Sequence, residues 1–187
     1  QKSNPSFYGM NQLNRVGILY NSLRVNDNIG MDNKFAFGSI AFQDKNFSIG
    51  FDINSFKLND IGLTTSFVNL SYIYKIQLSN YTFFLPSISI GMINSRINVD
   101  DLIFGDQLSI STGFIAATTL DTHAPQIGNV QEMDIGAGFI IHNELFLAGL
   151  SLKHLRQPNM SYNGDFDNNL PIKISIKGGY EFDIYKF

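Results

Sequence analysis

Residues 171–184 read PIKISIKGGYEFDI, and this stretch decides the fold. From Ile172 onward, apolar or aromatic side chains occupy every second position except Gly178, and mostly polar or charged side chains stand between them. Successive side chains of a strand point to opposite faces, so this period predicts a β-strand. Ordinary strands have about 5–6 residues, whereas membrane-spanning strands need about 9–11. The length therefore favours one membrane strand over 171–184, with Ile172, Ile174 and Ile176 facing lipid.

The same alternation recurs along the chain. We expect seven further strands, at 16–23, 34–42, 47–54, 68–78, 87–92, 132–141 and 146–153. Their polar positions hold small and charged residues. Because alternation alone does not show which face points inward, strand length and loops must decide between a membrane barrel and a soluble sandwich or lipocalin.

The connections between these strands alternate in length. Short ones lie near 43–46, at Ser79-Asn80 and at His142-Asn143, where asparagine is expected to adopt the positive φ of tight hairpin turns. Long ones lie at 24–33, 57–62, 97–129 and 154–170. Outer-membrane barrels combine short periplasmic turns with long extracellular loops. The chain is therefore predicted to be all-β, an antiparallel transmembrane β-barrel of the bacterial outer membrane, with a periplasmic N-terminus and extracellular long loops.

The composition agrees with a barrel. Hydrophobic residues make up 44% of the 187 residues, yet no run of 18 apolar residues exists, so no membrane helix is expected. The chain has 17 Phe and 8 Tyr, which suit the aromatic girdles of a barrel. A net charge of -3 gives no basic surface for nucleic acid, and the absence of cysteine excludes disulfides and thiolate chemistry.

The last residues bear on completeness. Outer-membrane barrels usually end in an aromatic residue, and Phe187 is one. The outward positions of the preceding strand are even-numbered, however, whereas Tyr185 and Phe187 are odd-numbered. We therefore expect residues 1–187 to form a single β-barrel domain that is truncated at both ends, with about eight strands of a larger barrel. Closure of eight strands into a small barrel is the alternative.

Four segments of the sequence are distinctive: NPSFYG at 4–9, LIFGDQL at 102–108, HLRQPN at 154–159 after the strand FLAGLSLK, and GGYEF at 178–182. They resemble segments of the PorP/SprF family of the type IX secretion system. The third is the most specific, because it is similar to the family's GLSxxHLxQPN element. The resemblance covers most of the chain in the same order. It implies a larger outer-membrane barrel that partners a secreted cargo protein, often a large adhesin, and contacts the secretion or gliding machinery.

The candidate partner-binding residues follow a strand directly, in a long loop. They are His154, Arg156, Gln157, Pro158 and Asn159. In one interpretation they bind the C-terminal region of a cargo protein. In the other they form a structural plug, in which Pro158 sets the chain direction while Arg156 and Asn159 hydrogen-bond inside the lumen. Both interpretations fit the sequence.

Other polar residues offer weaker signals for chemistry. Asp100, Asp101 and Asp106 do not have the spacing of an EF-hand loop, so a solvated loop is favoured over calcium binding. The three histidines lack HExxH spacing and cysteine partners, so no zinc site is predicted. No metal and no cofactor is expected.

Two carboxylates on one strand raise the question of catalysis. Glu132 and Asp134 have the spacing of a glycosidase pair, but a lumen charge network with Lys153, Lys173 and Lys177 is favoured. No Gly-x-Ser-x-Gly elbow is present. The leading hypothesis is a non-enzymatic barrel that contacts membrane lipid and serves type IX secretion. A general diffusion porin or small transport barrel is the alternative, and an outer-membrane enzyme is the third.

Overall fold

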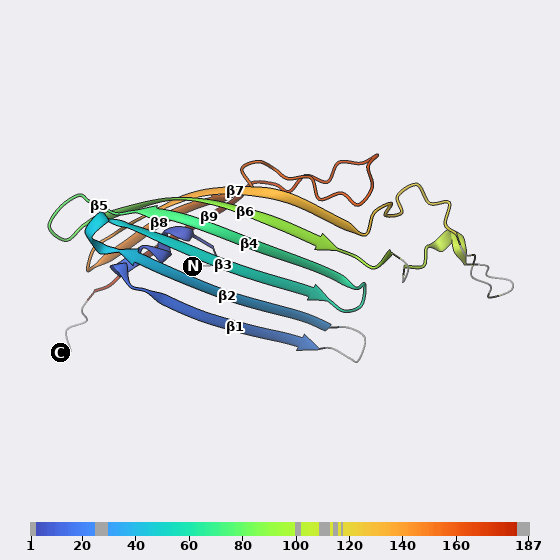
Figure 1. The fold of residues 1–187 in the computed structure, drawn as a ribbon, viewed down its shortest axis with the longest axis horizontal. Coiled ribbons are helices and arrows are strands. Elements are labelled where there is room, and N and C mark those ends of the chain that lie inside the picture. Colours follow the sequence, from blue (N-terminus) through green and yellow to red (C-terminus); the bar gives the residue numbers. More distant parts are fainter. Residues whose placement is uncertain are drawn as a thin grey trace.

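The computed structural model describes residues 3–24, 30–99, 102–108, 113, 116 and 118–182, and its strands form one curled antiparallel sheet (Figure 1). The strands of this part of the chain are β1 (Arg15–Arg24), β2 (Gly30–Phe42), β3 (Phe47–Leu58), β4 (Leu63–Tyr74), β5 (Ile76–Gln77), β6 (Phe83–Arg96), β7 (Asn129–His142), β8 (Phe146–Lys153) and β9 (Lys173–Tyr180). Neighbours follow chain order, except that the short β5 pairs only with β6. Every consecutive pair is antiparallel, so the sheet is a meander that curls into a half-barrel.

The eight predicted strands are confirmed as the eight long strands of this sheet. Most extend further than the alternation suggested, and β6 reaches 14 residues. The strand predicted over 68–78 is wrong at its end, since β4 stops at Tyr74 and β5 follows after Lys75. There the Lys75 N–H turns to the carbonyl of Asn46, 2.7 Å away, and leaves the ladder.

The prediction of one strand over 171–184 is wrong in length. Regular pairing runs from Lys173 to Tyr180, and each of these residues pairs with one of β8. Since β8 itself begins at Phe146, it offers little partner backbone beyond Tyr180. Positions 183–184 lie outside the described residues. The expected outward face is confirmed, because Ile174 and Ile176 are 63% and 81% exposed.

Two connections are shorter than predicted. The loop expected at 24–33 is reduced because β2 already begins at Gly30, and that expected at 57–62 is reduced to the residues between Leu58 and Leu63. The other two long loops, expected at 97–129 and 154–170, are present at 97–128 and 154–172 and lie at the same end of the sheet (Figure 1). The turns 43–46, 78–82 and 143–145 occupy the opposite end. The predicted division into a short-turn end and a long-loop end therefore holds for these two loops and is wrong for the connections before β2 and β4, which are about as short as the turns.

The asparagines of the short turns act in different ways. Asn46 has the expected positive φ, 53°. Asn143 instead accepts the backbone N–H groups of Leu145 and Phe146 on its side-chain oxygen, at 2.8 and 2.7 Å. The expectation of positive φ is wrong for Asn80 and Asn143, because side-chain and backbone hydrogen bonds close these turns without it.

Polar residues line the concave face of the sheet and apolar residues cover the convex face. In β3, Ser48, Asp52 and Asn54 are buried on the concave side, whereas Phe51 and Ile53 are 43% and 40% exposed. The same exposure recurs on the convex side of neighbouring strands, at Val68, Leu70, Tyr72, Ile88, Ile90, Met92, Met133 and Ile135. An apolar outside around a polar inside is the arrangement of an outer-membrane barrel wall.

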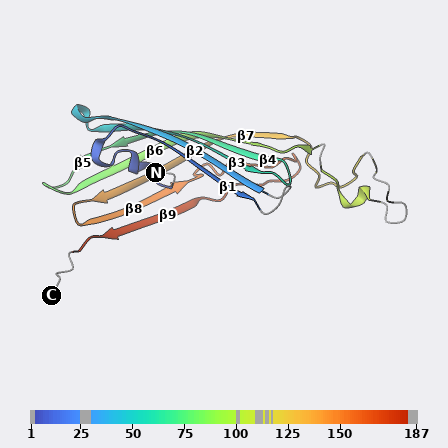
Figure 2. The same cartoon turned by 90° about the horizontal axis from the view of Figure 1, so that it is seen from below.

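The half-barrel is open within the described residues. There β1 pairs only with β2 and β9 only with β8, so the two strands form the edges of the curl (Figure 2). An eight-stranded closed barrel is therefore not what these strands form. Across the same residues, no helix is both long and apolar enough to span a membrane.

Candidate functional site

The N-terminal segment lies against the concave face at the short-turn end. It contains the 3-10 helices η1 (Pro5–Tyr8) and η2 (Met10–Gln12). Asn4, Ser6 and Tyr8 are 1%, 0% and 1% exposed, although they belong to a short polar segment. We call residues 3–14 the N-terminal plug.

The first residues of the N-terminal plug bind the backbone and side chains of β7 and β8. The Asn4 amide donates to the carbonyls of Phe139 and Leu150, each at 3.2 Å. The Ser151 hydroxyl donates to the carbonyl of Ser3 at 2.6 Å. One asparagine thereby bridges two strands, which fixes the start of the plug in the lumen.

Side chains further along the N-terminal plug bind the other wall. The hydroxyls of Ser6 and Ser87 lie 2.7 Å apart, and the Tyr8 hydroxyl donates to Asp52 at 3.1 Å. The second Asp52 oxygen accepts from the Asn69 amide at 2.9 Å. Burial, with the adjacent carboxylate, raises the pKa of the Tyr8 phenol, so its hydroxyl remains a donor.

The ring of Tyr8 fits a hollow that only glycine leaves open. A Cβ at Gly50 would lie 2.3 Å from a Tyr8 ring carbon. The ring also packs with Ile73, Leu85 and Ile140 in a small buried cluster. The plug is therefore held by shape as well as by polar contacts.

A kink at His154 begins the connection between β8 and β9. His154 has a φ of 58°, and the Leu155 N–H bonds the Ile135 carbonyl of β7 at 3.0 Å. The His154 Nδ1 lies 2.9 Å from an Asp134 oxygen, with the two side chains 16% and 9% exposed. The ring is not aligned for a hydrogen bond in this contact.

Asn159 organises the loop that follows. Its side-chain oxygen accepts the backbone N–H groups of Ser161 and Asn168, both at 3.0 Å. Its amide donates to Asp167 at 2.9 Å, and its backbone bridges Asn169. Asn159 thus closes a hairpin-like loop, and we call residues 158–170 the mouth loop.

The mouth loop covers the long-loop end of the concave face. Met160 is buried against Ile93 and Val130. The Tyr162 hydroxyl donates to the Ser95 hydroxyl at 2.7 Å. These contacts join the mouth loop to β6 and β7, at the opposite end of the lumen from the N-terminal plug.

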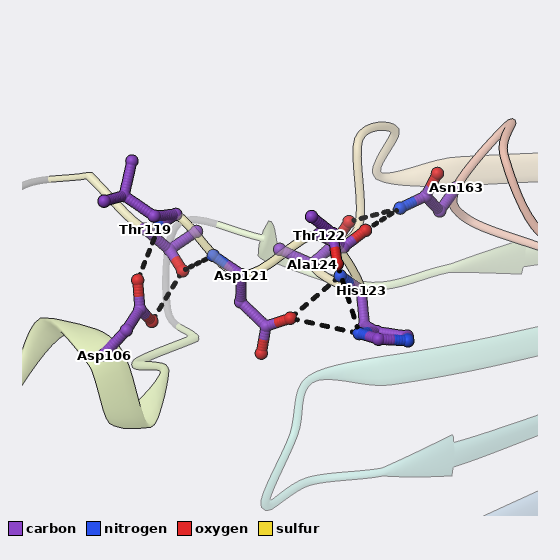
Figure 3. A network of polar contacts seen from close by, with 8 residues as sticks. Asp106, Thr119, Asp121, Thr122, His123, Ala124 and Asn163 are labelled. Carbon is purple, nitrogen blue, oxygen red and sulfur yellow. Dashed lines mark hydrogen bonds and ion pairs between the residues drawn. The ribbon is translucent and has the colours of Figure 1, made fainter.

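The other long connection is joined to the mouth loop. The Asn163 amide donates to the carbonyls of Thr122 and Ala124, at 2.8 and 3.2 Å (Figure 3). The Gln126 N–H bonds the Tyr162 carbonyl at 2.8 Å. The two loops therefore present one joined outer surface.

Asp106 and Asp121 order the outer part of the 97–128 connection. The Asp106 carboxylate accepts the Leu120 N–H and, at 2.7 Å, the Thr119 hydroxyl (Figure 3). These bonds hold the pKa of Asp106 below its ordinary value. Asp121 accepts the backbone N–H of His123 at 2.8 Å. Both aspartates thus stabilise the conformation of this connection through hydrogen bonds within it.

The acidic residues of this connection bear on metal binding. Asp100 and Asp101 lie outside the described residues, so the interpretation of this acidic stretch stays a prediction there. Elsewhere in the described chain, no group of three or more His, Asp or Glu side chains is placed to hold a metal ion.

A cavity of about 440 Å³ lies on the concave face, and we call it the lumen cavity. Its lining consists of Ser3, Asp52, Asn54, Phe67, Asn69, Asp134, Lys153, His154, Lys173 and Lys177. The structure thus brings together Asp134 and the three lysines of the predicted charge network. Glu132 shares their face but does not line the cavity.

Comparison with known proteins settles the family. A family model described as "Type IX secretion system membrane protein PorP/SprF" matches residues 2–187. The chain belongs to the PorP/SprF family. The resemblance drawn from the four sequence segments is thereby confirmed. No match was found among curated proteins, and none among solved structures.

The candidate partner-binding residues of this PorP/SprF protein fall into two groups. His154, Pro158 and Asn159 are built into the fold, since Pro158 is buried and its carbonyl accepts an N–H of the mouth loop at 3.0 Å. Arg156 and Gln157 are exposed, and Gln157 has a φ of 50°. A lumen hydrogen bond of Arg156, as the plug interpretation requires, is not found among the described residues. Partner binding by these five residues stays a prediction.

Sequence reasoning missed the residues that fill the PorP/SprF lumen. Asn4, Ser6 and Tyr8 belong to the NPSFYG segment, to which no role was assigned. Two glycines could have indicated these contacts. Gly50 and Gly138 lie at concave positions, where the lack of a side chain leaves room for Tyr8 and Asn4. Glycine at an inward-facing strand position indicates a close approach by another segment.

Proposed function

We propose that this PorP/SprF protein is a non-enzymatic outer-membrane barrel that partners a secreted cargo protein or the secretion or gliding machinery in type IX secretion. The family establishes a type IX secretion-associated membrane protein, and the apolar convex face fits the outer membrane. We further propose that the N-terminal plug lies at the periplasmic end and that the long loops are extracellular. The C-terminal region of a cargo protein, such as a large adhesin, is the proposed partner of those loops.

One observation carries this proposal: the chain fills both ends of its own concave face. The N-terminal plug occupies one end, and the mouth loop packs on the other. A diffusion porin needs a continuous water-filled path, and both segments lie on the concave face, where such a path would run. The same observation therefore favours a partner role over the porin alternative.

The joined outer loops supply a surface for that partner. Leu120, Ile127 and Phe166 are 89%, 50% and 43% exposed, although they are apolar. Arg156 stands near the base of the mouth loop with an exposed guanidinium, a group suited to planar contact with a carboxylate. Aromatic residues and arginine are enriched in protein interfaces.

The test separates binding from folding. Arg156→Ala combined with Gln157→Ala should lower the amount of cargo that co-purifies with the detergent-solubilised barrel, while its abundance stays constant. Arg24→Ala, at an exposed arginine of the same sheet end, is the matched control. Unchanged cargo in the double variant would remove these residues from the interface. A large stable conductance of the native protein in planar bilayers would favour the porin instead.

A further inference from the structure

The lumen cavity is lined by two kinds of polar side chain. The lysines Lys153, Lys173 and Lys177 come from β8 and β9. The oxygen-bearing side chains Asp52 and Asn54 come from β3, and Asp134 comes from β7, the strand that pairs with β8. A ligand in the cavity would therefore meet both ammonium groups and hydrogen-bond acceptors.

Among the described residues, no carboxylate forms an ion pair with Lys173 or Lys177. Asp52 already accepts from Tyr8 and Asn69, one donor on each oxygen. Within the described residues, neither Lys173 nor Lys177 has a carboxylate oxygen within 4.0 Å. Lys177 instead lies 5.0 Å above a phenyl ring of the plug. These two ammonium groups are available to an anion.

Two buried oxygens in the cavity lining lack donors. The side-chain oxygen of Asn54 and one oxygen of Asp134 accept no hydrogen bond, although the residues are only 6% and 7% exposed. Buried acceptors are usually satisfied, and those that are not call for a bound partner. Since both residues line the lumen cavity, a ligand there can supply the missing donors.

From these features we infer that the lumen cavity binds a small carboxylate that also carries an N–H or O–H donor, as a free amino acid or a peptide carboxy-terminus does. The carboxylate lies against Lys173 and Lys177, and the donor faces Asp134 and Asn54. The volume of about 440 Å³ falls within the range of roughly 300–1,000 Å³ typical of small-molecule sites. The site lies apart from the exposed outer loops, so its test and that of the partner role have separate outcomes.

Four probes test this chemistry on the detergent-purified full chain by isothermal titration. N-acetylglycine has both groups, acetate lacks the donor, and N-acetylglycinamide lacks the carboxylate. We expect N-acetylglycine to bind more tightly than acetate and the amide not to bind. Glycine is the fourth probe: preference for glycine identifies a free amino acid, and preference for N-acetylglycine a peptide end. Equal binding of N-acetylglycine and its amide, or no binding of N-acetylglycine and glycine, overturns the inference.

Variants then locate the site. Lys173→Gln with Lys177→Gln should weaken N-acetylglycine binding about tenfold or more, because each lost ammonium group removes a charge-assisted hydrogen bond. Lys57→Gln removes an exposed lysine outside the cavity and should leave affinity unchanged. Asp134→Asn should reduce the preference for N-acetylglycine over acetate. If the double variant and Lys57→Gln bind N-acetylglycine with equal affinity, the two lysines do not form the site. The comparison of probes on the native protein tests the inference even if a variant fails to fold.

Discussion

Gly50→Ala should release the N-terminal plug while leaving the sheet intact. The new Cβ would lie 2.3 and 2.5 Å from two ring carbons of Tyr8, where carbon atoms normally lie about 3.5–4.0 Å apart. Because β3 is paired along its length with both β2 and β4, the strand cannot retreat and the ring must move. Overpacking of this kind costs about 1–3 kcal/mol. That cost corresponds to a shift of about 5- to 150-fold toward the released plug.

A cysteine reporter measures the shift. Ser6 is fully buried and the chain has no cysteine, so Ser6→Cys gives a single thiol whose maleimide labelling follows plug release. The labelling rate in detergent should rise about 5- to 150-fold when Gly50→Ala is added. Gly38→Ala on neighbouring β2 is the control, because its Cβ would meet its nearest atom, the carbonyl oxygen of Arg15, at an ordinary 3.7 Å. Equal rates in the two alanine backgrounds would refute the seating of Tyr8 against Gly50.

Three further predictions concern the wall, the outer loops and the orientation. Ile176→Arg on the exposed convex face should lower the stability of the barrel to heat by about 2–4 kcal/mol, and Ser175→Arg on the concave face should lower it much less. Equal losses would contradict the assignment of faces. The hydrogen bonds that lower the Asp106 pKa stabilise the loop fully above the ordinary Asp pKa of 3.8, and this stabilisation is lost as the pH falls through the lowered pKa. The protection of the Leu120 amide from hydrogen exchange should therefore fall with acid in the native protein but not in Asp106→Asn. An epitope inserted at Asn80 should stay hidden on intact cells, whereas protease should reach the 97–128 connection, and the opposite pattern would reverse the orientation.

The strands could be predicted because each wall position has a fixed environment. An exposed convex face and a polar concave face impose a period of two on every strand, and the sequence shows that period. Strand ends were less predictable, since a strand stops where its partner stops. β9 ends near Tyr180 because β8 begins at Phe146, although the alternation in the sequence continues.

The site was only partly predictable for a related reason. Asn159 closes a local turn through neighbours within about ten positions, and asparagine is a familiar residue for that role. Asn4, by contrast, binds carbonyls 135 and 146 positions away. No local pattern reports such a distant partner. The alternation placed Asp134 and the three lysines on one face, but the lumen cavity and its unpaired acceptors depend on packing and became evident only in the structure.

The bridge made by Asn4 also constrains the order of folding. The two carbonyls that accept its hydrogen bonds lie on β7 and β8, so the binding site of the N-terminal plug is incomplete until those strands have paired. Contacts between residues so far apart in sequence form slowly, because a long chain segment must first be closed. The earliest part of the chain is therefore among the last to reach its final position. Before that moment the polar concave face is uncovered at the short-turn end, and the N-terminal plug covers it only when the fold is complete.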